Sequence, residues 1–213
     1  MGNSSSKKSD LINIITYNTK LLSFSPFKCE KIINYLVSQK DSNFIICLQG
    51  VYNKDSIEFI NNNITKHFEI DKTIPSIINE CPSVLGLKII SSFPIYSFNY
   101  INFKDNNDIL NIIDKNKKGI LCSNIIIDNN IISIYNTNFQ PDIKSILNCA
   151  DIRNIQLDIL IDFIKDNTKK LLEKNKDINF KVPRFNIVFG SFYFDSNDNI
   201  YNIVINNFID ISK

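Results

Sequence analysis

Short apolar runs alternate with segments of helical periodicity along this chain, and that alternation restricts the fold more than any other feature. "LINIITYN" at 11–18 and "NFIICLQ" at 43–49 have the β-branched, apolar character of strands. Between them, 25–40 begins with Ser-Pro and repeats apolar residues at helical spacing, as 54–68 also does. Strands interleaved with helices indicate sheets that are covered by helices.

The later part of the chain has a different order of elements. Four strand-like runs follow one another, at 85–91, 95–103, 119–127 and 131–138. After them come a long amphipathic helix at 146–174, a buried strand at 184–190 and a last helix at 198–210. This order predicts an α/β (α+β) fold in which two mixed β-sheets pack as a sandwich with helices outside, in four layers.

Composition sets limits on the organisation and the compartment. The 213 residues suit one domain, which we place at 11–213 after a flexible leader at 1–10. The formal charge of +2 makes nucleic acid an unfavoured partner. The odd number of cysteines, without a CxxC pair, argues against a disulfide framework: Cys29, Cys47, Cys81, Cys122 and Cys149. With no signal peptide and no apolar run of membrane-spanning length, we expect a cytoplasmic rather than a secreted protein.

The first eight residues, "MGNSSSKK", carry a targeting pattern. Gly2 follows the initiator methionine, Ser6 stands where the N-myristoylation pattern has Ser or Thr, and Lys7 and Lys8 follow. One acyl chain binds membranes weakly, and nearby lysines add attraction to anionic lipid. The pattern therefore predicts reversible, peripheral membrane association through Gly2; the competing interpretation is a Ser-rich leader without modification.

Several short motifs occur in a fixed order along the expected strands and helices. They are "TYN" (16–18), "LQG" (48–50), "GLKIISSFPI" (86–95), "KG" (118–119), "NTNFQ" (136–140), "RNIQLDILIDFI" (153–164) and "GSFY" (190–193). In this order they resemble the endonuclease/exonuclease/phosphatase superfamily of metal-dependent phosphodiesterases, and its sphingomyelinase branch most closely. The resemblance extends from about Ile12 to Phe208 and implies the same two-sheet sandwich.

The resemblance also shows what this chain lacks at the family's catalytic positions. The family's "LQE" glutamate binds the divalent metal, and Gly50 stands in its place. Asn138 replaces the histidine of "THLQ" that contacts the scissile phosphate. Ser191 and Tyr193 replace the Asp and Asn of "GDxN", which act on the attacking water and hold the phosphate. Of the catalytic set only Asn18 is retained.

These replacements predict a pseudoenzyme with no cofactor. Mg²⁺ needs carboxylate ligands to offset its dehydration, and without the metal neither the phosphoryl oxygens nor the attacking water is activated. The one histidine, His67, lies at the end of the second expected helix (54–68), away from every motif. We interpret His67 as a surface or packing residue rather than a proton-transfer group.

Two alternatives stay open. A rearranged Mg²⁺ site could use Asp142 with Asp195, and Asp55 and Glu58 also follow the expected strand ends; ordinary turn residues explain them equally well. A nucleic-acid-binding relic is the other alternative, which the near-neutral charge counts against.

The family's closing "SDH" motif does not occur in the sequence. From this we expect a sandwich trimmed at its C-terminal side, with an exposed strand edge. Because exposed edges tend to be paired or covered, we also expect self-association or an unidentified protein partner.

Overall fold

The computed structural model describes residues 11–38, 43–67, 85–103, 118–142, 149–174 and 186–194, and only the backbone of 64–67. The described strands are β1 (Ile12–Leu21), β2 (Asn43–Val51), β3 (Leu87–Ser91), β4 (Ile95–Asn102), β5 (Gly119–Ile127), β6 (Asn130–Asn138) and β7 (Asn186–Ser191). The described helices are α1 (Pro26–Ser38), α2 (Lys54–His67) and α4 (Cys149–Lys174).

The first sheet has the strand order β1-β2-β3. β1 and β2 are parallel because α1 connects them, whereas β2 and β3 pair antiparallel. β2 lies between its two neighbours and reads as a nearly continuous apolar run, and all of its residues after Asn43 are buried. A central strand covered on both faces requires such a run.

The second sheet has the strand order β4-β5-β6-β7. β4, β5 and β6 pair antiparallel, and β7 joins β6 in parallel after the α4 connection. Each sheet is therefore mixed, and each contains one parallel pair whose carboxyl ends lie side by side.

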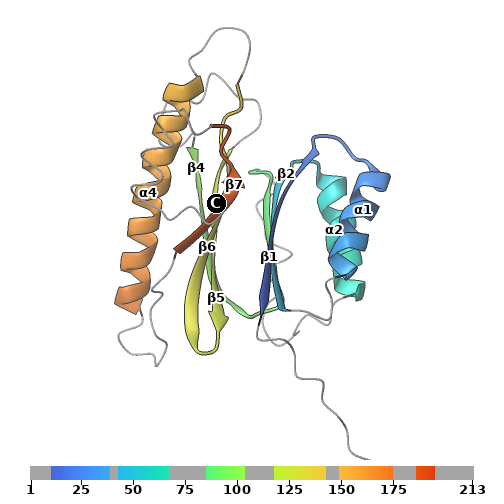
Figure 1. Ribbon diagram of the computed structural model, residues 1–213, viewed down its shortest axis with the longest axis horizontal. Coiled ribbons are helices and arrows are strands. Elements are labelled where there is room, and N and C mark those ends of the chain that lie inside the picture. Colours follow the sequence, from blue (N-terminus) through green and yellow to red (C-terminus); the bar gives the residue numbers. More distant parts are fainter. Residues whose placement is uncertain are drawn as a thin grey trace, which may run out of the picture.

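Three buried apolar clusters separate four layers (Figure 1). One cluster lies between α1, α2 and the first sheet, and includes Leu36 and Ile46. The second lies between α4 and the second sheet, and includes Tyr135 and Leu160. The third fills the space between the two sheets, where Ile89 and Ile134 belong to the same cluster. The predicted four-layer sandwich is confirmed.

The expected elements agree closely with those observed, and the difference at β1 is informative. The strand predicted to end at Asn18 continues to Leu21 through an irregularity in its pairing with β2 between Asn18 and Leu21. Because Thr19 and Lys20 are polar, the sequence pattern did not indicate that the strand continues past Asn18. The helix expected at 198–210 lies outside the described residues.

Two other sequence expectations concern cysteines and membranes. Cys29, Cys47, Cys122 and Cys149 are buried free thiols, and Cys81 lies outside the described residues. Among the helices described, none combines the length and the hydropathy needed to cross a bilayer.

Candidate functional site

The two parallel strand pairs bring the positions that the motif resemblance singles out to one end of the sandwich. In the first sheet Asn18 is paired with Gln49, the residue before Gly50. In the second sheet Asn138 is paired with Ser191. Hydrogen bonds between Asn18 and the β7 end then join the sheets at this point. The geometry therefore assembles the candidate site from residues that are far apart in the sequence.

The side chain of Asn18 is committed to hydrogen bonds within the protein. Its Nδ2 donates to Ser191 Oγ at 2.9 Å and to the Tyr193 hydroxyl at 3.1 Å. Its Oδ1 accepts the backbone N–H of Lys20 at 3.2 Å. Ser191 and Tyr193, which stand at the Asp and Asn of the "GDxN" motif in the resemblance, thus accept the hydrogen bonds that the Asn18 amide donates.

Gly50 adopts a conformation that strongly favours glycine. Its φ is +73°, and a Cβ added there would lie 2.8 Å from Asn18 Oδ1 and 2.9 Å from the Lys20 backbone nitrogen. The irregularity in β1 brings Lys20 this close, and Lys20 itself has a φ of 52°. The position therefore lacks a carboxylate and also lacks the space for one.

Tyr193 holds its hydroxyl over the site by an unusual backbone conformation. Its φ is 57°, in the left-handed region that bulky residues rarely occupy. On either side of it, Phe192 and Phe194 pack in the cluster beneath α4, with ring centroids 5.5 Å apart, and Phe192 also contacts Phe139 at 5.2 Å. These aromatic contacts hold the backbone so that the Tyr193 hydroxyl reaches Asn18.

Asn138 lies at the same end of the sandwich but has a different partner. Its side chain is buried, and its Nδ2 donates to the hydroxyl of Tyr52 at 3.3 Å, while its Oδ1 is buried without a hydrogen-bond partner among the described residues. Sequence reasoning missed Tyr52. No sequence pattern pointed to Tyr52; in the structure Gly86, whose φ is +62°, leaves room for the Tyr52 ring, which a Cβ added at Gly86 would overlap.

A buried amide pair behind the site joins the two sheets. Gln49 Nε2 donates to Asn136 Oδ1 at 2.7 Å and to Thr16 Oγ1 at 3.0 Å. Asn136 Nδ2 donates to the carbonyls of Leu48 at 2.9 Å and Lys88 at 3.0 Å. Since every one of these groups would be costly to leave unpaired in the interior, the network fixes the register of one sheet against the other.

The carboxylate that follows β6 is engaged by an arginine. Arg153 of α4 is buried, and its Nη1 lies 2.7 Å from Asp142 Oδ1 and donates to the Gln140 carbonyl at 3.3 Å. Gln156 Oε1 accepts the Gln140 N–H at 2.9 Å. The Arg and Gln of the "RNIQ" motif thus hold the chain where it leaves β6.

The remaining candidates from the sequence lie apart from this cluster or outside the described residues. Asp55 and Glu58 are exposed on α2. Gly2, Asp195 and the side chain of His67 are not among the described residues.

The described side chains of the site do not fit a magnesium ion. Asn18, Gly50, Ser191 and Tyr193 offer no carboxylate, and hard divalent cations are held mainly by carboxylate and carbonyl oxygens. In the described part of the chain, no three His, Cys, Asp or Glu side chains converge as metal ligands. No step of a metal-assisted hydrolysis can be built from these residues.

Buried thiols near the site do not supply a nucleophile either. Burial raises the pKa of Cys47 far above its ordinary value, and burial raises that of Cys122 to about 12. Both thiols therefore remain protonated at neutral pH, and a thiol in that state is a poor nucleophile.

Comparison with known proteins identifies the fold. Sphingomyelinase C from Streptomyces griseocarneus has a TM-score of 0.61 at 15% identity, over 91% of this chain and 68% of that chain. A Staphylococcus aureus beta toxin variant with bound magnesium ions has a TM-score of 0.59 at 15% identity, over 91% and 69%. An endonuclease/exonuclease/phosphatase family protein from Leptotrichia buccalis has a TM-score of 0.52 at 13% identity, over 92% and 72%.

No protein-family model matches the sequence, and no curated protein matches it significantly. Identities this low establish the architecture alone. The chain has the fold of the endonuclease/exonuclease/phosphatase superfamily, as the order of its motifs predicted.

Proposed function

We propose that this protein is a non-catalytic member of the endonuclease/exonuclease/phosphatase fold that acts as a binding protein at a membrane surface. The observation that carries the proposal is the hydrogen bonding of Asn18 to Ser191 and Tyr193 beside Gly50. By the motif resemblance, this is where the family's metal and phosphate would meet, and the residues present offer no carboxylate to a metal ion.

The test is a hydrolysis assay on the full chain with Mg²⁺ or Mn²⁺, using a phosphodiester reporter and sphingomyelin as substrates. We expect no turnover above that of a heat-unfolded sample. Without a metal ligand at Gly50, charge on the phosphoryl oxygens is left unstabilised. Metal-dependent turnover with either substrate would contradict the proposal.

The alternative is a metal-dependent phosphodiesterase with a rearranged site. The resemblance to a beta toxin with bound magnesium ions favours it. Asp195, with Asp142, would then supply the carboxylates, and Asp195→Ala would abolish any turnover observed. Against this, Asp142 is already ion-paired with Arg153.

Membrane association is proposed from the leader. Gly2, Ser6 and the two lysines after it provide one acylation signal and a weak electrostatic one. In cells, Gly2→Ala is expected to move the protein from the membrane fraction to the soluble fraction, while Asn3→Ala, which leaves the acceptor glycine in place, is not. Equal membrane fractions for Gly2→Ala and the unmodified sequence would contradict the acyl anchor.

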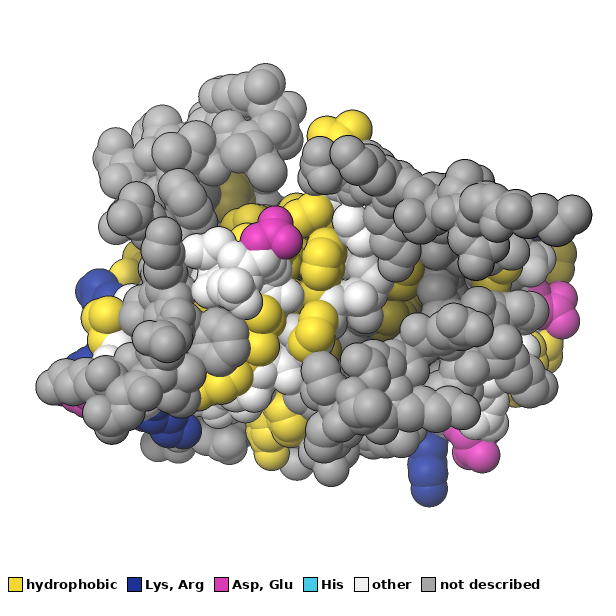
Figure 2. All heavy atoms as spheres, turned by 90° about the horizontal axis from the view of Figure 1, so that it is seen from below, with side chains coloured by type: hydrophobic (Ala, Val, Ile, Leu, Met, Phe, Trp, Pro, Cys, Tyr) yellow, Lys and Arg dark blue, Asp and Glu magenta, His cyan; other side chains and the backbone are white. Residues whose placement is uncertain are grey.

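Nucleic acid remains the less favoured partner. On the face seen from below, the described Lys and Arg side chains are scattered at the margin and form no continuous basic patch (Figure 2). Backbone binding to nucleic acid needs several such contacts in one region.

A further inference from the structure

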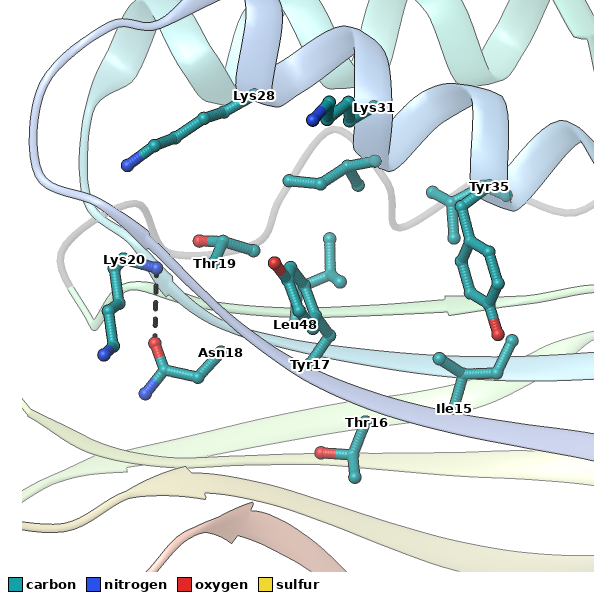
Figure 3. A pocket seen from close by; sticks show the side chains of 12 residues that line it. Ile15, Thr16, Tyr17, Asn18, Thr19, Lys20, Lys28, Lys31, Tyr35 and Leu48 are labelled. Atoms are coloured by element: carbon teal, nitrogen blue, oxygen red, sulfur yellow. Dashed lines mark hydrogen bonds between the residues drawn. The ribbon is translucent and has the colours of Figure 1, made fainter.

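A pocket lies between strand β1 and helix α1, on the side of β1 that faces the helix (Figure 3). Its volume is about 550 Å³, within the range of roughly 300–1,000 Å³ that is typical of small-ligand pockets. Asn18 marks its boundary with the site described above, because the Asn18 amide is bonded to Ser191 on the opposite sheet. The pocket itself has no role in the functions considered so far.

Two lysines of α1 make the pocket cationic. Lys28 and Lys31 stand one turn apart on α1 and reach over the pocket, whereas Lys20 lines it at the end of β1 with its side chain turned toward Asn18 (Figure 3). None of the lining residues described carries a carboxylate, and none of the three lysines forms an ion pair within the described part of the chain. Cationic groups without a counter-charge favour an anionic ligand.

The floor of the pocket is apolar. Ile32 and Leu36 of α1 and Leu48 of β2 are buried beneath it. Tyr17 and Tyr35 stand at its sides and are 54% and 53% exposed. A ligand that satisfies both the lysines and this floor has an anionic head and a hydrocarbon part.

The loop after β1 and the first turn of α1 present large apolar side chains beside the lysines. Leu22 and Phe27 are 64% and 65% exposed, and they lie in the sequence between Lys20 and Lys31. Lys31 Nζ lies 4.4 Å from the centre of the Phe27 ring. Exposed apolar groups flanked by lysines are the combination that interfacial membrane binding uses.

We propose that the β1–α1 pocket binds an anionic membrane lipid. The phosphate-bearing headgroup contacts Lys28 and Lys31, and the acyl chain lies against the apolar floor. Leu22 and Phe27 enter the headgroup region beside it. This inference deepens the proposed membrane association and rests on it, but it requires no acyl group on Gly2.

The test uses unacylated full chain and sedimentation with phosphatidylcholine vesicles, with and without phosphatidylserine. We expect binding only to the anionic vesicles, and an affinity at least about tenfold lower for Lys28→Glu/Lys31→Glu, because each lysine near an anionic surface contributes about 1 kcal/mol. The control Lys165→Glu/Lys169→Glu makes the same charge change on exposed residues of α4 and is expected to bind like the original protein. Equal losses for both double variants would overturn a pocket-specific site.

A second measurement reports on the pocket itself. The chain has no tryptophan, so Tyr35→Trp introduces a single, selectively excitable indole at the pocket, and Tyr100→Trp places one at a half-exposed position on β4. Anionic vesicles are expected to shift the emission of Tyr35→Trp to shorter wavelength and to leave Tyr100→Trp unchanged. No shift for Tyr35→Trp would overturn the proposal.

Two further arms separate other anionic ligands. The same shift with inorganic phosphate alone would make the pocket a phosphate site and overturn the lipid assignment. Binding of single-stranded DNA without binding of vesicles, lost in Lys28→Glu/Lys31→Glu, would assign it to nucleic acid instead. Since the protein is unacylated throughout, failure here leaves the Gly2 anchor and the hydrolysis assay as independent tests of the proposed function.

Discussion

Gly50 and Tyr193 both have left-handed backbone conformations beside the candidate site, with φ of 73° and 57°. For glycine that conformation has no steric penalty, whereas for a bulky aromatic it persists only where the surroundings hold it. Phe192 and Phe194 provide that hold through the cluster beneath α4. At this scale the site depends on backbone conformation as much as on side-chain identity.

A glutamate introduced at position 50 is therefore expected to strain the backbone and not to create a metal site. Gly50→Glu should lower the free energy of unfolding by about 1–3 kcal/mol, because the new Cβ meets the Lys20 backbone at positive φ. Calorimetric titration should detect no Mg²⁺ binding. Urea unfolding gives the stability.

Gly50→Ala is the matched control, since it adds the Cβ without the carboxylate. Its destabilisation should equal most of that of Gly50→Glu. A Gly50→Glu protein of unchanged stability that binds Mg²⁺ would show that the site has kept the family's geometry.

At the scale of elements, helix α4 is joined to the second sheet by buried polar groups as well as by apolar packing. Asn167 Nδ2 donates to the Tyr135 hydroxyl at 2.9 Å and lies 3.4 Å from Cys122 Sγ. Burial raises the pKa of the Cys122 thiol from 9.0 to about 12. Burial also raises the pKa of the Tyr135 hydroxyl well above its ordinary value. The packing of α4 against the second sheet is therefore most stable while the Cys122 thiol and the Tyr135 hydroxyl are protonated.

Stability is expected to fall in alkaline solution for this reason. The unfolded thiol ionises near pH 9.0, whereas the folded thiol of Cys122 stays protonated to about pH 12. Its contribution is fully present below pH 9.0 and is lost as the pH rises towards 12, at about 1.4 kcal/mol per pH unit. Urea unfolding followed by circular dichroism at a series of pH values measures this slope.

Cys122→Ala removes one of the titrating groups. It should lower the stability at neutral pH through the smaller side chain but give a shallower decline above pH 9.0. Identical slopes for the two proteins would contradict the assignment to Cys122.

At the scale of the whole molecule, β1 lies at one end of the first sheet, and among the described strands only β2 pairs with it. Ile14 and Tyr17 on this strand are 38% and 54% exposed. Strand edges with exposed apolar side chains are sites where a second chain can pair. The edge is therefore the place where self-association is expected.

Light scattering of the purified protein should accordingly show a dimer that dissociates on dilution. Ile14→Lys should shift it to monomer, because a lysine on the edge opposes strand pairing. Leu172→Lys, at a similarly exposed apolar position on α4, should not. A protein that is monomeric at every concentration would contradict self-association through this edge.

Most of the fold was predictable because its signals are local. The apolar run of β2, the helical spacing of α1 and the parallel pairs implied by the connecting helices can all be identified from short windows of sequence. The extension of β1 through Thr19 and Lys20 was not predictable in this way. Thr19 and Lys20 belong to the strand because the chain pairs with β2 again at Leu21, and not because their residue types form a strand pattern.

By itself the sequence determined the order of the elements and the two-sheet fold, since both depend on residue patterns along the chain; the loss of the family's catalytic side chains stays a prediction from the motif resemblance. Only the tertiary structure decided how Asn18 bonds to Ser191 and Tyr193, how Tyr52 reaches Asn138 and that Arg153 engages Asp142. Asn18 and Ser191 are 173 residues apart, and their contact exists only once the two sheets have packed face to face. Long-range contacts of this kind are set by packing between layers, to which no local sequence pattern corresponds.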